Sequence, residues 1–143
     1  MANSNQINNR VATPAPGMGG TIKTFRATIP LVAGDLTLNA VHGALDLPAG
    51  VEIISGAIWA TDMDTNGTPL LAFHVGDVAD PDRYFVSSQV GRAGTASTDM
   101  AVTGYGFTTT AKTRVNVTVS AAAATAAAGT LNVALNGRIS DPA

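Results

Sequence analysis

The chain has 143 residues, of which 45% are hydrophobic and only 13% are charged, and it contains no cysteine. These values exclude an intrinsically disordered chain, a disulfide framework, thiolate catalysis and a cysteine-based zinc site. The formal net charge of −2 argues against a nucleic-acid partner, because nucleic-acid binders usually carry a basic surface.

The charged fraction is about half the usual ~25% of a soluble domain. Two interpretations remain open: a partner or further copies of the chain cover part of the surface, or the chain is a soluble β-domain rich in threonine and alanine. No run of residues approaches the length of an apolar membrane span, so we expect no membrane partner.

Residues 1–20 are polar at first and then rich in proline and glycine. Because this composition offers no core of its own, we predict an extended N-terminal arm followed by one folded domain over residues 21–143. Residues 1–34 carry three basic residues and no acid, whereas residues 35–143 carry five basic and ten acidic residues. A basic arm could dock on an acidic surface, although so few charges could also be distributed this way by chance. The predicted contact residues in the arm are Asn8, Arg10, Thr13, Pro14 and Pro16.

After the arm, apolar residues recur at every second position, which is typical of β-strands. The first such run ends at Pro30, and a change of apolar phase at Gly104 indicates a bulge. The predicted strands lie within residues 25–29, 36–40, 51–61, 71–75, 84–88, 100–107, 115–119 and 131–139. About eight strands with turn signals at short spacing predict an all-β fold, an antiparallel β-sandwich resembling a jelly roll.

The stretch DMDTNG, residues 62–67, resembles the beginning of an EF-hand calcium loop. However, the twelfth position of that loop, which needs a bidentate carboxylate, is Phe73. Asn-Gly between two apolar runs is instead a strong signal for a β-hairpin turn. We therefore predict that the strand containing Trp59 returns directly as the strand containing Phe73, with Asp62 and Asp64 capping the turn or facing solvent.

A second acidic segment contains Asp77, Asp80 and Asp82 beside Arg83. An acidic loop is the simpler interpretation, and the alternative is a calcium site formed by Asp62, Asp64 and Asp77.

The chain has two histidines, His42 and His74, and no GxSxG, HExxH or P-loop motif. We therefore expect neither an enzyme nor a bound cofactor.

Residues 121–129, AAAATAAAG, have the highest helix propensity in the chain. Nine residues without a capping or amphipathic pattern form only a marginal helix, so we predict a long hairpin tip that contains at most one helical turn. Such a tip is apolar and uncharged, which suits a contact with a partner. The candidate contact residues there are Ala122, Ala124 and Ala127.

Three segments together resemble the capsid decoration, or cement, proteins of tailed bacteriophages. They are LDLPAGVEIISGAIWATDMDTNG at 45–67, HVGDVADPDRYFV at 74–86 and VNVTVSAAAATAAAGTLNVALNGRI at 115–139. The resemblance extends over residues 21–140 and rests on the general character of the sequence, not on a diagnostic motif. It implies a β-sandwich, often a homotrimer, that binds the major capsid protein outside the head between capsomers, with an arm reaching onto the shell.

We accordingly expect a structural virion protein that is made in the host cytoplasm and stabilises the capsid from its exterior. Two alternatives remain at this stage. The first is a β module associated with the tail or a fibre of the virion. The second is a carbohydrate-binding domain that uses calcium at Asp62, Asp64 and Asp77.

Overall fold

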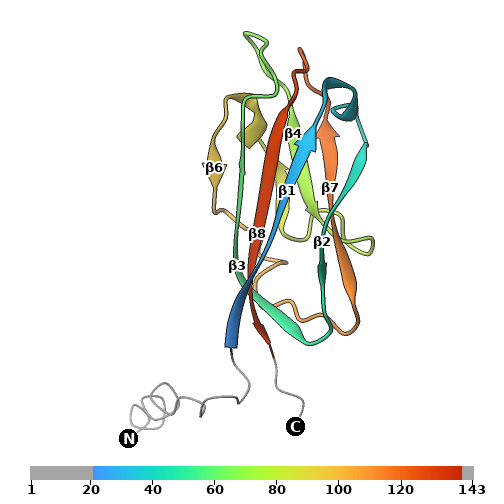
Figure 1. Ribbon diagram of the computed structural model, residues 1–143, viewed down its shortest axis with the longest axis vertical. Helices are drawn as coiled ribbons and strands as arrows, with labels where there is room; N and C mark the ends of the chain where they lie inside the picture. The colour runs from blue at the N-terminus through green and yellow to red at the C-terminus, as the bar shows by residue number, and fades with distance from the viewer. Residues whose placement is uncertain (1–20, 140–143) are drawn as a thin grey trace, which may run out of the picture.

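The computed structural model describes residues 21–139, so the predicted arm and its five contact residues lie outside the described part of the chain. This part contains eight strands and two short 3₁₀ helices, η1 and η2 (Figure 1). The elements are β1 (Thr21–Leu31), η1 (Ala33–Asp35), β2 (Val41–Leu47), β3 (Val51–Ala60), β4 (Ala72–Gly76), β5 (Phe85–Ser88), η2 (Val90–Arg92), β6 (Ala96–Ser97), β7 (Thr113–Ala121) and β8 (Gly129–Ile139).

The strands form two four-stranded antiparallel sheets. One sheet has the order β1-β8-β3-β6, and the other has the order β2-β7-β4-β5. Consecutive strands therefore fall mostly in opposite sheets, which is the connectivity of a jelly roll built from two Greek keys. The predicted antiparallel β-sandwich is confirmed.

The core lies between the two sheets and follows from the period-two patterns of the central strands. On β7, Val115, Val117 and Val119 are fully buried, while the residues between them face outward. Strand β8 contributes Leu131, Val133 and Leu135 to the same core. The wide aromatic side chains that fill the space between the sheets are Phe73, Tyr84 and Phe85.

Two predicted strands are wrong. Residues 36–40 form a turn, in which Leu36 is buried, Leu38 is exposed and Asn39 has a φ of 66°. The apparent alternation there comes from a single core contact by Leu36 after η1. Residues 100–107 are also turns, and the sixth strand is instead the two-residue β6. In addition, β1 continues through Pro30 to Leu31.

The predicted hairpin at residues 62–67 is wrong as well. Strand β3 pairs with β6 and β8, whereas β4 pairs with β5 and β7, so the segment between β3 and β4 crosses from one sheet to the other. Neither Asn66 nor Gly67 has the positive φ that the predicted turn requires. A local turn signal therefore identified a loop correctly but not the strands that it connects.

Four connections lie together at the end of the sandwich opposite the start of β1 and the end of β8 (Figure 1). We call this end the loop end, and its segments are residues 32–40, 61–71, 89–95 and 122–128. At the other end, Thr21 and Val51 both pair with Ile139. Within residues 21–139, none of the helices has the length and apolar character needed to cross a bilayer.

Candidate functional site

The loop end is organised around the buried carboxylate of Asp64, whose exposed fraction is 1%. Both of its oxygens accept hydrogen bonds from backbone N–H groups, some in its own loop and some in the segment between β7 and β8. The donors to Oδ2 are Leu70 (2.8 Å), Leu71 (3.1 Å) and Ala124 (3.0 Å), and the donors to Oδ1 are Thr125 (2.9 Å) and Asn66 (3.4 Å). One side chain therefore connects two loops that are far apart in sequence.

The environment of Asp64 strongly favours its ionised form. Burial alone would raise the pKa of the carboxyl, but the backbone N–H groups of Thr125, Ala124, Leu70 and Leu71 outweigh that effect. The pKa of Asp64 is consequently held well below its ordinary value. The carboxylate carries its charge throughout the physiological pH range, and the hydrogen bonds occupy both of its oxygens.

Residues 122–128, which we call the alanine tip, are further bound to the segment 61–71. The N–H of Thr65 donates to the carbonyl of Thr125 at 3.0 Å, and the N–H of Ala127 donates to the carbonyl of Met63 at 3.0 Å. The amide of Asn66 donates to the hydroxyl of Thr125 at 2.9 Å. The predicted hairpin tip is wrong, because this segment connects β7 in one sheet to β8 in the other. It has no helical turn, and these bonds hold it as an irregular connection.

The alanine tip presents small apolar side chains on an ordered backbone. Ala122 and Ala124 are exposed, and Ala127 is half-buried. Larger exposed apolar side chains occur on the neighbouring connections of the loop end: Val32, Leu38 and Leu70. This end of the molecule can therefore offer an apolar contact surface whose conformation is already fixed before binding.

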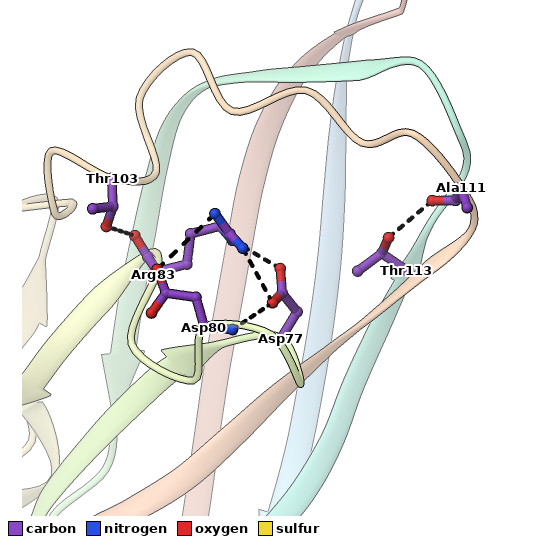
Figure 2. A network of polar contacts seen from close by, with 6 residues as sticks. All are labelled: Asp77, Asp80, Arg83, Thr103, Ala111 and Thr113. Carbon is purple, nitrogen blue, oxygen red and sulfur yellow. Dashed lines mark hydrogen bonds and ion pairs between the residues drawn. The ribbon is translucent and has the colours of Figure 1, made fainter.

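A second polar cluster lies beyond the opposite end of β4 (Figure 2). The Nε of Arg83 donates to Oδ2 of the buried Asp77 at 2.8 Å, and the N–H of Asp80 donates to Oδ1 of Asp77 at 2.9 Å. The guanidinium lies 3.7 Å from the ring centroid of Phe107. Thr103 donates its hydroxyl to the carbonyl of Arg83 at 2.7 Å, so the cluster attaches the long β6–β7 connection to the β4–β5 loop.

The three acids considered for calcium do not converge. Asp62 is exposed and accepts the N–H of Asp64 at 3.1 Å, while Asp77 is paired with Arg83 beyond the far end of β4. Within residues 21–139, no three carboxylates or histidines cluster in a way that could hold a metal ion. His42 and His74 bond separately, to the carbonyl of Asp35 and to the N–H of Ser87. The geometry therefore gives the calcium-dependent alternative no support.

The outer face of the β1-β8-β3-β6 sheet carries cross-strand pairs that no local sequence pattern marks. The guanidinium of Arg26 on β1 lies 5.1 Å from the ring centroid of Trp59 on β3. Thr24 donates to Asn136 at 2.7 Å, and Asn136 donates to Ser55 at 2.8 Å. Predicting such pairs requires the strand order, because β1 and β3 are both neighbours of β8 and not of each other.

The strand order and the hydrogen-bonded loop end define a jelly-roll protein with exposed apolar side chains on an ordered end of the sandwich. No protein-family model and no curated protein matches the chain. Among solved structures, a chain of the cyanophage Pam1 capsid asymmetric unit has 34% sequence identity and a TM-score of 0.79, with 91% of this chain and 93% of that chain covered. The protein belongs to the family of that phage capsid chain and is a structural component of a virion.

Two more distant structures share the fold. A chain of the capsid of Ralstonia phage GP4 has 24% identity and a TM-score of 0.76, with 92% of each chain covered. A chain from the acidic stable capsid structure of Helicobacter pylori bacteriophage KHP30 has 14% identity and a TM-score of 0.56, with 87% of this chain and 92% of that chain covered.

Proposed function

We propose that the protein is a non-enzymatic capsid decoration protein, which binds the outside of a phage shell between capsomers and stabilises it. The single observation that supports this most strongly is the 34% identity, over nearly the whole chain, to a chain of a phage capsid. The jelly roll with its rigid loop end is compatible with this role. The proposed partners are the major capsid protein and further copies of the chain in a homotrimer.

In this role the mechanism is mechanical. Each copy buries surface against neighbouring subunits, and specific contacts of this kind usually bury about 1,200–2,000 Å². Repetition over a symmetric shell adds the contributions of many such contacts, so moderate individual affinities give a strongly reinforced particle. The domain has a buried core, and hydrogen bonds join its loops. It should transmit mechanical load with little deformation, because close-packed protein interiors are poorly compressible.

The proposed contact regions are the arm, with Asn8, Arg10, Thr13, Pro14 and Pro16, and the alanine tip, with Ala122, Ala124 and Ala127. A contact through the alanine tip has more support than one through the arm, because Asp64 fixes the backbone of the tip at Ala124 and Thr125. A preordered tip loses little conformational entropy when it binds.

The direct test is co-sedimentation of the purified protein with empty capsids that lack it, followed by measurement of capsid heat resistance. We expect saturable binding and a higher disruption temperature. Absence of both effects would overturn the proposed function. Attachment to isolated tails rather than heads would instead identify a tail- or fibre-associated module.

Two variants test the proposed contact regions in the same assay. Deletion of residues 1–20 should weaken capsid binding while the circular dichroism spectrum of the β-domain is retained. Ala124→Asp should weaken binding if the alanine tip contacts the shell. Val78→Asp is the matched control, since Val78 is also exposed but lies in the β4–β5 loop away from the loop end. Equal binding by Ala124→Asp and Val78→Asp would remove the tip from the interface.

A further inference from the structure

The four edge strands of the sandwich differ greatly in how well they could accept another strand. Strand β6 has two residues, and β5 has four and includes Ser87 with a φ of 45°. The pairing of β2 is interrupted by a register shift between Gly43 and Leu45. Short, irregular edges of this kind resist pairing with further strands. Strand β1, in contrast, runs for 11 residues in unbroken register with β8.

Pro30 reveals which backbone groups of β1 face the open edge. Proline has no N–H, so Pro30 cannot donate to β8 although it pairs with Thr130 in the ladder. In an antiparallel ladder the residues that bond to the neighbouring strand alternate with residues whose N–H and C=O point away. The C=O of Thr130 accepts the N–H of Thr61 at 3.0 Å and therefore faces the β3 side. Pro30, which is in register with Thr130, and the other even-numbered residues of β1 therefore direct their backbone groups to the open edge. The N–H groups concerned are those of Ile22, Thr24, Arg26 and Thr28.

These edge groups have no backbone partner within residues 21–139. A regular row of free N–H and C=O groups is the template for strand addition, in which main-chain hydrogen bonds supply affinity. The side chains beside this row are ordered, because Thr28 donates to Asn132 at 2.8 Å and Arg26 lies against Trp59. The edge is thus already in the conformation that an added strand needs.

The charge of β1 indicates the chemistry of the partner. The strand contains Lys23 and Arg26 and no acidic residue. Full antiparallel overlap of two β1 strands would place Arg26 opposite the same residue of a second copy, and directly opposed like charges are destabilising. The edge therefore suits a strand that is uncharged or acidic, and it does not suit a second copy of itself.

We propose that the free edge of β1 accepts an extended, uncharged or acidic segment of the neighbouring shell protein and so continues the β1-β8-β3-β6 sheet into the capsid. This inference rests on the proposed function and names the mode of attachment. The chain preceding Thr21 leaves from the same strand, so an arm that reaches the shell would begin beside this contact.

The test is hydrogen exchange of the full-length protein, free and bound to empty capsids. We expect the amides of Ile22, Thr24, Arg26 and Thr28 to exchange quickly in the free protein and at least about tenfold more slowly in the bound protein. Binding without protection of these amides overturns the proposal while leaving the proposed function intact. Failure of the wild-type protein to bind overturns both. Protection in the free protein that disappears on deletion of residues 1–20 also overturns it, because the chain's own arm would then occupy the edge.

A pair of variants provides an independent measurement. Thr28→Pro removes one edge N–H and projects a ring toward the partner strand, so capsid affinity should fall roughly tenfold or more. Both substitutions remove the hydroxyl that donates to Asn132, but Thr28→Val keeps the backbone N–H. The capsid affinity of Thr28→Val should therefore stay within about twofold of wild type. Equal binding by the two variants contradicts the proposal. If Thr28→Pro fails to fold, as judged by its melting curve, the exchange experiment decides.

Discussion

The carboxylate of Asp64 accepts a hydrogen bond from the backbone N–H of Thr125 at 2.9 Å, although the two residues are 61 positions apart. This contact joins the connection between β3 and β4 to the connection between β7 and β8. Each of these connections links the two sheets, so the carboxylate also fixes the loop end relative to the core.

Replacing Asp64 by asparagine should lower the free energy of unfolding by about 3 kcal/mol or more. The side-chain amide of asparagine has only one acceptor oxygen. Its NH₂ group is itself a donor, so it would face backbone N–H groups without being able to accept a hydrogen bond from them. Urea denaturation measures the loss. Asp62→Asn is the matched control, because Asp62 is exposed and its amide oxygen can still accept the N–H of Asp64, so we expect a change within about 0.5 kcal/mol. Equal effects of the two substitutions would contradict the central role of Asp64.

The same residue should give the protein an acid-sensitive stability. The pKa of Asp64 is lowered in the folded state, so the unfolded chain binds a proton first as the pH falls. Its contribution is therefore complete above the unfolded pKa of about 4 and is lost progressively below that value. Melting temperatures measured from pH 6 to lower pH should fall steeply for the wild type and less steeply for Asp64→Asn. Parallel curves would show that other carboxyl groups cause the acid sensitivity.

At alkaline pH the titrating group that matters is Tyr84. Burial raises the pKa of its hydroxyl to about 12, whereas an unfolded tyrosine ionises near pH 10. Because the unfolded state loses the proton first, stability should decrease between these two values, by up to roughly 3 kcal/mol. Tyr84→Phe should remove this decrease, which denaturant titrations at a series of pH values can measure. A decrease of the same size in the variant would assign it to another group.

Calcium should leave the melting temperature unchanged. The oxygens of Asp64 already accept backbone N–H groups, and Asp77 is paired with Arg83, so neither carboxylate is free to coordinate a cation. Scanning calorimetry with added calcium, and with a chelator as the control, tests this expectation. A calcium-dependent rise of several degrees would reveal a specific site and revive the alternative of a calcium-dependent domain.

Gly76 should not tolerate a side chain. A Cβ at this position would collide with the backbone of Asp80 and Pro81, which the β4–β5 loop brings against the end of β4. Backbone atoms cannot move aside as flexible side chains do, so Gly76→Ala should destabilise the protein by about 2 kcal/mol or more. Gly67→Ala is the control, since a Cβ there would meet open space and the φ is not positive. Similar stability of both variants would contradict this packing.

The all-β class, the sandwich and six of its strands (β1, β3, β4, β5, β7 and β8) could be predicted from sequence because a half-buried strand imposes strict alternation. The residues that become β3, β4, β7 and β8 have long periodic or continuous apolar runs, and the structure confirms strands there. The apolar run at 36–40 is too short for alternation to identify a strand, and in the structure Leu36 is buried while Leu38 is exposed. Alternation over a few residues cannot distinguish a strand from a turn with one anchored side chain.

The role of Asp64 could not be predicted, because its bonding partners are backbone groups rather than characteristic side chains. Any residue except proline can supply an N–H, so Ala124 and Thr125 leave no recognisable pattern beside the acid. The residues nearest to Asp64 in the motif DMDTNG predict a hairpin instead. The strand order, which decides the sheet of each strand, depends on packing across the whole domain.

The pairing of β1 with β8 has a consequence for how the protein is made. These are the first and last strands of the described domain, and β8 also separates β1 from β3. During translation, the sheet that contains them cannot form until β8 has been synthesised. Folding should therefore be a late and concerted event with many contacts between distant residues, which places it among the slower small domains, on the order of milliseconds to seconds. Until then the apolar strands remain exposed, so newly made chains should depend on chaperones or on dilution to avoid aggregation.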